Sequence, residues 1–234
     1  MWRAACLIWL AALTPAHAQS LLPLPYEQVE AGTRGRIDFS TLPDKPYPGY
    51  NLDQGYAFDG GLIGQHFSGQ SVEALAKGDD LFDALGPGAA TAPLKVEMGP
   101  PGQTLSISLH RVFGSNALYP LGPTGQPQPD ARGEGMVSIL FHRDICRFGL
   151  KVHTEYLDDL GTNAEHRGAV ELRFLARDGD LIAAVHLDLP GGVSHLGFET
   201  ADGAASVAGV QVLNRDKGGI SIDDIRFGCL QNLS

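Results

Sequence analysis

The sequence has few long apolar runs and a deficit of positive charge. Residues 4–13 form an apolar run, and about ten residues are too few to span a bilayer. Lys and Arg number 17 against 27 Asp and Glu, which gives a net charge of -10. Nucleic acids and anionic membrane surfaces reward clusters of Lys and Arg. We therefore expect neither nucleic acid nor membrane insertion for the mature chain.

The first eighteen residues have the pattern of a secretory signal peptide. Arg3 supplies a positive start, the apolar run follows, and Ala16-His17-Ala18 is a small-x-small cleavage site. Residues 1–18 are therefore set aside from the fold, and the protein is expected to be exported to the periplasm or the extracellular space. Loss of Arg3 takes the net charge from -10 to -11.

Cysteine and tryptophan are scarcer still after cleavage. Cys6 and both tryptophans lie in residues 1–18, so the mature chain retains Cys146 and Cys229 and has no tryptophan. In an oxidising compartment two strand thiols predict one disulfide, Cys146–Cys229, with two free buried thiols as the alternative. Without tryptophan, the strongest aromatic platform for a sugar ring is missing.

Turn residues are abundant, with 30 glycines and 15 prolines, which favours many short strands over long helices. Residues 19–33 are interpreted as an extended, proline-stiffened lead-in rather than a helix. Residues 34–234 are interpreted as a single all-β domain, an antiparallel β-sandwich of about ten short strands. Residues 71–91 are read as mostly loop, with Asp79, Asp80 and Asp83 in solvent.

The stretch 219–229 predicts a closing strand with an irregularity. Ile220 and Ile222 alternate with polar residues, but strict alternation would then send Asp224 into the core and Ile225 into solvent. A β-bulge at Asp223–Asp224 restores the apolar face. A carboxylate at the core edge then needs a partner, either a cation or a backbone turn.

Short segments of the second half resemble known exported domains. The likeness is to bacterial jelly-roll domains, including those with PEP-CTERM sorting tails, and to galactose-binding-like carbohydrate-binding modules. It implies a jelly roll and spans about residues 136–228. The segments that carry it are 137–141, 148–152, 172–174, 178–181, 195–198 and 222–227.

The resemblance also implies a structural calcium ion between the first and last strands. Asp38, Asp223 and Asp224 are the candidate ligands, because calcium takes six to eight oxygens in flexible geometry. The alternative is that Asp223 and Asp224 satisfy the bulge or pair with Arg36 or Arg226.

Four tyrosines in predicted loops are candidates for stacking on sugar rings. They are Tyr47, Tyr50, Tyr119 and Tyr156. Sandwich loops commonly present aromatic side chains to ligands, whereas many loop tyrosines are only partly buried anchors.

Signals for catalysis are weak. The sequence has no Gly-x-Ser-x-Gly elbow, and its histidines lack the close spacing of zinc ligands, although His142, His153 and His186 fall on predicted strands. The first hypothesis is a non-catalytic exported β-sandwich that binds glycan and calcium. The alternatives are a structural or interaction domain without a small ligand, and a secreted glycan-active enzyme.

Overall fold

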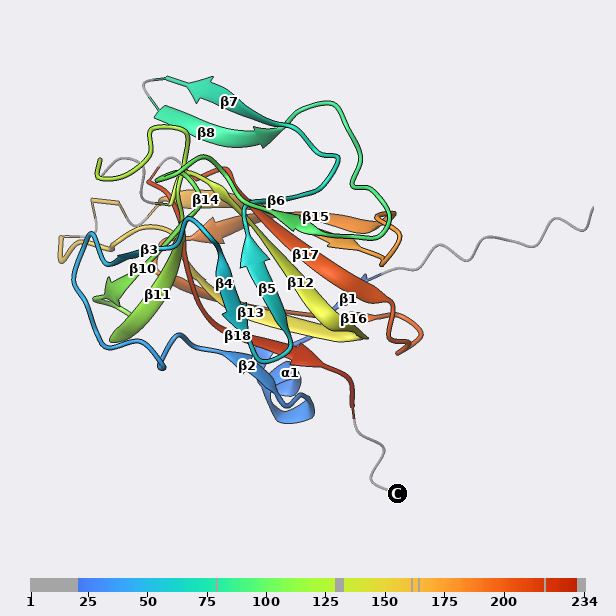
Figure 1. Ribbon diagram of the computed structural model, residues 1–234. Helices are drawn as coiled ribbons and strands as arrows, with labels where there is room; N and C mark the ends of the chain where they lie inside the picture. Colours follow the sequence, from blue (N-terminus) through green and yellow to red (C-terminus); the bar gives the residue numbers. More distant parts are fainter. Residues whose placement is uncertain are drawn as a thin grey trace, which may run out of the picture.

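The chain folds into two antiparallel sheets that pack face to face, as Figure 1 shows. The prediction of an all-β sandwich is confirmed. Among the described residues, no helix has the length and apolar character needed to cross a membrane. The computed structural model describes residues 21–78, 80–128, 133–160, 162–163, 165–216 and 218–230, so the predicted signal peptide lies outside them.

The first sheet has the order β1-β16-β13-β18-β11-β10-β3, with β2 paired to β18. Its central strand β18 is the closing strand that the sequence predicts. The bounds are β1 Leu21–Pro23, β2 Gly35–Ile37, β3 Tyr50–Asn51, β10 Leu105–His110, β11 Ser115–Pro120, β13 Arg147–His153, β16 Val193–Thr200 and β18 Ser221–Gly228.

The second sheet has the order β15-β14-β17-β12-β5-β4. Two further strand pairs, β6 with β9 and β7 with β8, stand outside both sheets. The bounds are β4 Tyr56–Phe58, β5 Gly61–Gly64, β6 His66–Phe67, β7 Val72–Lys77, β8 Asp80–Leu85, β9 Val96–Glu97, β12 Met136–Ile145, β14 Arg167–Leu175, β15 Leu181–Pro190 and β17 Val207–Asn214.

The main core lies between the two sheets. Phe148 and Ile222 enter it from the first sheet, and Leu172 and Val212 from the second, each almost fully buried. Alternating apolar residues on facing strands produce such a layer, because successive side chains point to opposite faces. Burial of this apolar surface is the main stabilising term of the fold.

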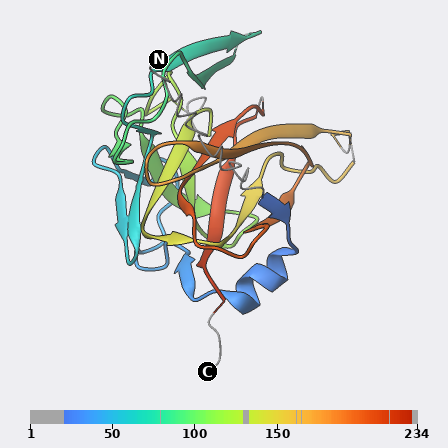
Figure 2. The ribbon, with the colours of Figure 1, turned by 90° about the vertical axis from the view of Figure 1, so that its right-hand side faces the viewer.

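The lead-in was predicted to be extended, and that is wrong for residues 26–32. They form helix α1 (Tyr26–Gly32), which begins after Pro25 and has Glu27 in its first turn. Proline is compatible with a helix start, because its fixed φ suits a helix and the missing N–H would have had no partner. Figure 2 shows α1 below the sandwich. A seven-residue helix behind two prolines carries little periodicity for a sequence argument to use.

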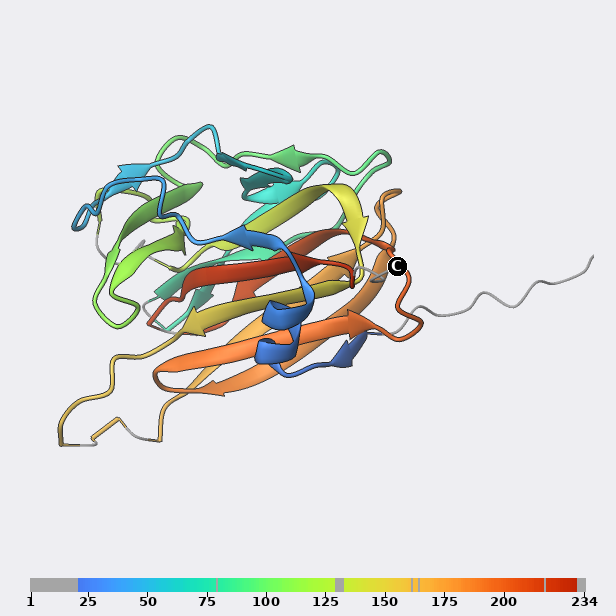
Figure 3. The same cartoon turned by 90° about the horizontal axis from the view of Figure 1, so that it is seen from below.

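Two glycines on neighbouring strands let α1 approach the sheet. Gly149 and Gly197 are register partners on β13 and β16. A Cβ on Gly149 would lie 3.2 Å from Tyr26 and 3.3 Å from Val29, and one on Gly197 would lie 2.9 Å from Val29. Tyr26 and Val29 are buried there, and Figure 3 shows the helix against the strands.

Residues 71–91 were predicted to be mostly loop, but they contain the β7–β8 hairpin, which stands apart from both sheets in Figure 1. Asp83, predicted to be in solvent, is only 3% exposed. Its Oδ2 accepts from Gln65 Nε2 (3.0 Å) and Met136 N (3.3 Å), and burial raises its pKa to about 7. Asp79 lies outside the described residues.

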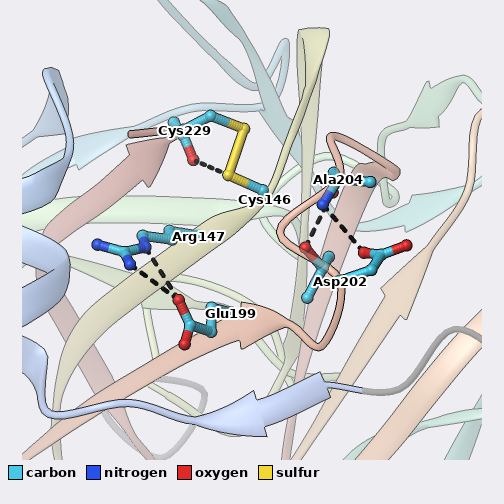
Figure 4. The surroundings of a disulfide bond; sticks show 8 residues. Cys146, Arg147, Glu199, Asp202, Ala204 and Cys229 are labelled. Atoms are coloured by element: carbon cyan, nitrogen blue, oxygen red, sulfur yellow. Dashed lines mark hydrogen bonds and ion pairs between the residues drawn. A yellow bond between two sulfur atoms is a disulfide. The ribbon is translucent and has the colours of Figure 1, made fainter. Parts of the chain in front are cut away.

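The predicted disulfide between Cys146 and Cys229 is confirmed. Cys146 lies between β12 and β13, where the chain passes from the second sheet to the first, and Cys229 follows β18. Figure 4 shows the bridge beside the ion pair of Arg147 with Glu199, whose nitrogen and oxygen are 2.9 Å apart. The bond thus ties the crossover between sheets to the end of the closing strand.

Candidate ligand pocket at the end of β13

The bulge predicted at Asp223–Asp224 is present in β18. Lys151 pairs with Asp223 and Gly149 with Arg226, so Leu150 faces both Asp224 and Ile225. Asp224 has φ of 46°, in the left-handed region that Asp tolerates better than most residues. The bulge returns Ile225 to the core, where it is 0% exposed.

Three cations surround the Asp224 carboxylate. Arg36 Nε and Lys151 Nζ each lie 2.8 Å from it, and Arg226 Nε lies 2.9 Å away. Burial alone would raise the pKa of Asp224, but the hydrogen bonds from Lys151 and Arg36, with the Arg226 charge, hold it well below its usual range. The Asp224 carboxylate therefore has partners within the protein, as the alternative to calcium binding predicts.

The other two predicted calcium ligands also have protein partners. Asp223 accepts from Ser115 Oγ (2.8 Å) and from the Asp224 backbone N–H (2.7 Å), and burial raises its pKa to about 6. Asp38 accepts from Ser40 Oγ (2.7 Å) and pairs with Arg36 at 3.1 Å. Arg36 thus bridges Asp38 and Asp224.

Calcium binding stays a prediction. Among the described residues, no group of three or more His, Cys, Asp or Glu side chains is placed to hold a metal ion. A calcium ion at Asp224 would have to displace the surrounding cations. Calorimetry of EDTA-treated protein is the measurement: a higher melting temperature on addition of calcium would support the site, and an unchanged one would reject it.

The structure separates the four candidate tyrosines. Tyr119 and Tyr156 line one pocket. Tyr47 donates to the carbonyl of Pro127, and Tyr50, 3.1 Å from the Pro43 carbonyl, also lies beneath the Lys45 ammonium. Tyr50 is on β3 and Tyr119 on β11, so the prediction that both lie in loops is wrong.

The pocket that contains Tyr119 and Tyr156 has a volume of about 220 Å³. Its lining residues include the last residues of β10 and β13, His110 and His153, and the first residue of β18, Ser221. The residues that line it are His110, Tyr119, His153, Thr154, Glu155, Tyr156, Gly218, Gly219, Ile220 and Ser221.

His110 is held as a neutral imidazole. The backbone N–H groups of Val112 and Phe113 both donate to its Nδ1 at 3.2 Å, so this nitrogen carries no hydrogen. Nε2 then carries the hydrogen and donates to Tyr156 Oη at 3.1 Å. The two rings stack at an interplanar angle of 16°, and the Arg111 guanidinium lies 4.6 Å from the Tyr156 ring centre.

His153 and Ser221 are register partners at the ends of β13 and β18. Opposed residues of an antiparallel pair point to the same face, with Cβ atoms about 5 Å apart. They are 3% and 2% exposed, and neither His153 Nε2 nor Ser221 Oγ has a hydrogen-bond partner among the described residues. Burial and the Arg111 charge lower the pKa of His153 to about 4.

A second group of ionisable side chains borders the pocket at Gly218. Asp216 Oδ1 lies 3.0 Å from His166 Nε2, and Glu155 Oε2 lies 3.9 Å from His166 Nδ1. A Cβ on Gly218 would lie 3.5 Å from Glu155 Oε2 and 3.9 Å from Asp216 Oδ2. Of the two carboxylates, Glu155 lines the pocket, whereas Asp216 is buried next to it and does not line it.

A larger hollow of about 460 Å³ lies beside the disulfide, with Arg34, Arg143 and Phe227 among its lining residues. Among the described side chains, the residues that line it contribute no buried polar atom without a partner. The pocket at His153 is therefore the stronger candidate.

The pairing of His153 with His110 was missed by the sequence argument. Their ring centres are 4.5 Å apart, and Tyr156 lies 4.4 Å from His153. His142 and His186, the other histidines on predicted strands, do not line the pocket. No local spacing could have signalled the cluster, because His110 and His153 are far apart in the sequence and lie on strands that β11 and β18 separate in the sheet.

No protein-family model and no curated protein matches the sequence. Among solved structures, part of the chain superposes on the enzymatically active domain of tailspike protein 4 of bacteriophage CBA120, with 12% sequence identity and a TM-score of 0.31. The match covers 54% of this chain and 18% of the tailspike chain. A likeness at this level indicates neither fold nor activity.

Proposed function

We propose that the protein is an exported, non-catalytic β-sandwich that binds glycan through the pocket at His153. Export is supported by the disulfide, because such bonds persist mainly in oxidising compartments. The ligand class is supported by the lining, which combines aromatic rings with hydrogen-bonding groups, as sites for polar ring-shaped ligands do.

The observation that carries this proposal is the pair of unpartnered polar atoms, His153 Nε2 and Ser221 Oγ. A buried polar group without a partner costs about 1–3 kcal/mol, so a ligand hydroxyl that bonded to one would offset that cost. Both atoms are screened from solvent in this structure. Ligand contact therefore requires a neighbour to shift, and we expect it to be Tyr156, which is 38% exposed and follows the end of β13.

The size of the pocket limits what enters it. Clefts for drug-sized ligands are roughly 300–1,000 Å³, whereas this pocket is about 220 Å³. One sugar ring fits such a volume better than a length of polysaccharide. We therefore propose that the pocket receives a terminal sugar of a glycan.

The test is a glycan array followed by titration calorimetry with the best-binding sugar. Tyr156→Ala is expected to weaken binding about tenfold or more, because the ring both lines the pocket and bonds His110. Tyr50→Ala is the matched control, since Tyr50 does not line the pocket. An array without a hit, or equal losses in the two variants, would refute the proposal.

A further inference from the structure

We infer that the hollow beside the disulfide is a second binding site, which takes a small ring-containing ligand with an oxyanion group: a carboxylate, a sulfonate or a phosphate. The hollow shares no lining residue with the pocket at His153, and the inference does not rest on the proposed glycan binding. Its volume of about 460 Å³ lies within the range of roughly 300–1,000 Å³ that is typical of small-ligand clefts.

Two guanidinium groups at this hollow have no partner in the protein. Arg34 and Arg143 both line it and both are exposed. Neither forms an ion pair or a side-chain hydrogen bond in the part of the chain that the structure describes. A guanidinium presents its N–H donors in a planar fork that matches the oxygens of an oxyanion. Only water has to leave these donors before a ligand binds them.

The carboxylates at the hollow do not cancel this charge. Asp144 is engaged by Arg177, whose Nε and Nη2 lie 3.0 Å and 2.5 Å from its Oδ1. Asp59, between β4 and β5, is the other acid among the lining residues. In the described part of the chain, two guanidiniums without an ion pair thus line the hollow beside one such carboxylate. On a protein of net charge -10, this local excess of positive charge favours an anionic ligand.

An irregularity in β12 positions two of the polar lining residues. Between Leu140 and Ile145, β12 has four residues where its neighbour β17 has one. A bulge of this kind re-aims side chains, and bulges are frequent beside functional sites. Of the four residues, His142 and Arg143 line the hollow. The bulge therefore supplies an imidazole and a guanidinium to the same site.

The hollow also has apolar surface that a ligand ring can contact. Ile145 and Phe227 line it, together with Gly35 and Gly60. A Cβ on Gly35 would lie 2.5 Å from the Phe227 ring, and one on Gly60 would lie 3.2 Å from it. A larger residue at either position would crowd the ring, whereas glycine leaves the ring in the lining. Small-ligand sites commonly combine apolar lining with a few polar groups that orient the ligand.

Matched aromatic probes isolate the oxyanion. Benzoate, benzenesulfonate and phenyl phosphate would be titrated beside benzamide, which has the shape of benzoate without its charge, by calorimetry with the mature protein at low salt. An exposed ion pair strengthens binding by at most about fivefold, so with two guanidiniums at least one anion should bind about tenfold more tightly than benzamide. The anion that binds best identifies the oxyanion. Equal binding of all four probes, or binding of none, would overturn the inference.

Arg34→Gln and Arg143→Gln should each weaken binding of the best anion about threefold while leaving binding of benzamide unchanged. Lys95→Gln is the matched control, because it removes the same charge from a side chain that is 72% exposed and does not line the hollow. Equal effects of the three variants would show that only long-range charge matters, and would overturn the assignment of the arginines.

Asp59→Asn should act in the opposite direction and tighten binding of the anion about twofold, because it removes a carboxylate from the lining. A gain in affinity does not arise from damage to the fold, so this variant keeps the test decisive even where an arginine variant unfolds. Unchanged or weaker binding in Asp59→Asn would contradict an anion site in this hollow.

The histidine rings locate the bound anion and separate this site from the proposed glycan pocket. His142 lines the hollow, whereas His153 lines the other pocket. In long-range proton–nitrogen spectra, the anion should shift His142 and leave His153 unchanged. Shifts of His153 alone would place the anion in the glycan pocket and overturn the second site. Absence of any sugar binding would overturn the proposed function and leave this inference standing.

Discussion

Removal of the Cys146–Cys229 disulfide is expected to lower the free energy of unfolding by about 4–5 kcal/mol. The bond closes a loop with a sequence separation of 83 residues, and long closed loops restrict the unfolded chain most. It also ties the crossover after β12 to the end of β18. Without it, packing and hydrogen bonds such as that from Cys146 N to the Gly228 carbonyl hold the end of β18 against this crossover.

Urea denaturation of a Cys146→Ala, Cys229→Ala double variant, beside the oxidised and reduced parent protein, measures this loss. The reduced parent should resemble the double variant, which separates the missing bond from the missing sulfur atoms. If the free energies of unfolding of the parent and the double variant differ by less than about 1 kcal/mol, the disulfide does not stabilise the fold as proposed.

Asp224→Asn is expected to cost about 2–3 kcal/mol at pH 7. Removal of one partner from a buried ion pair typically costs about 3–5 kcal/mol, because charges are left unpaired. The expectation here is lower because the side chain of Arg36 is 48% exposed and solvent screens that pair. Asparagine keeps the size and tolerates the left-handed φ of 46°, so the change isolates the charge.

The dependence on pH follows from the direction of the shift. The cations hold the pKa of Asp224 well below its usual value, so its stabilisation is full above the unfolded pKa of about 3.9 and is lost as pH falls toward the folded value. Asp223, whose pKa is raised to about 6, acts in the opposite sense, since stability falls as pH rises toward 6. The Asp224 effect is therefore clearest below pH 4.

Thermal unfolding from pH 2 to 7 measures both effects. The parent protein should lose stability steeply below pH 4, and Asp224→Asn should flatten that part of the curve. Asp38→Asn is the control, because its side chain is 26% exposed and its pair with Arg36 is worth less than about 1 kcal/mol. Parallel curves for the parent and Asp224→Asn would contradict the role of the cations.

The features predicted correctly from sequence are those that follow from local rules. The break of alternation at Asp224 required a bulge, and the two cysteines that follow a predicted signal peptide predicted one bond. Helix α1 was missed because seven residues give little periodicity. The β7–β8 hairpin was missed because Asp83 is buried by tertiary contacts with Gln65 and Met136, which no local pattern reveals.

The pocket could be predicted only in part. Their residue type made Tyr119 and Tyr156 candidates for ligand binding. It could not show that they line the pocket while Tyr47 and Tyr50 do not. Membership depends on the tertiary arrangement, which brings His110 at the end of β10 into ring contact with His153 at the end of β13. That arrangement is set by the packing of the whole core, so the sequence placed His153 on a predicted strand but did not reveal that it pairs with Ser221.

The most direct test of the account is to locate the bound sugar. Long-range proton–nitrogen spectra of the histidine rings, recorded while the sugar identified on the array is added, would report it. The account predicts saturable shifts of His110 and His153, and none for His186, whose side chain is 75% exposed on β15. A sugar that binds while His110 and His153 remain unshifted would contradict it.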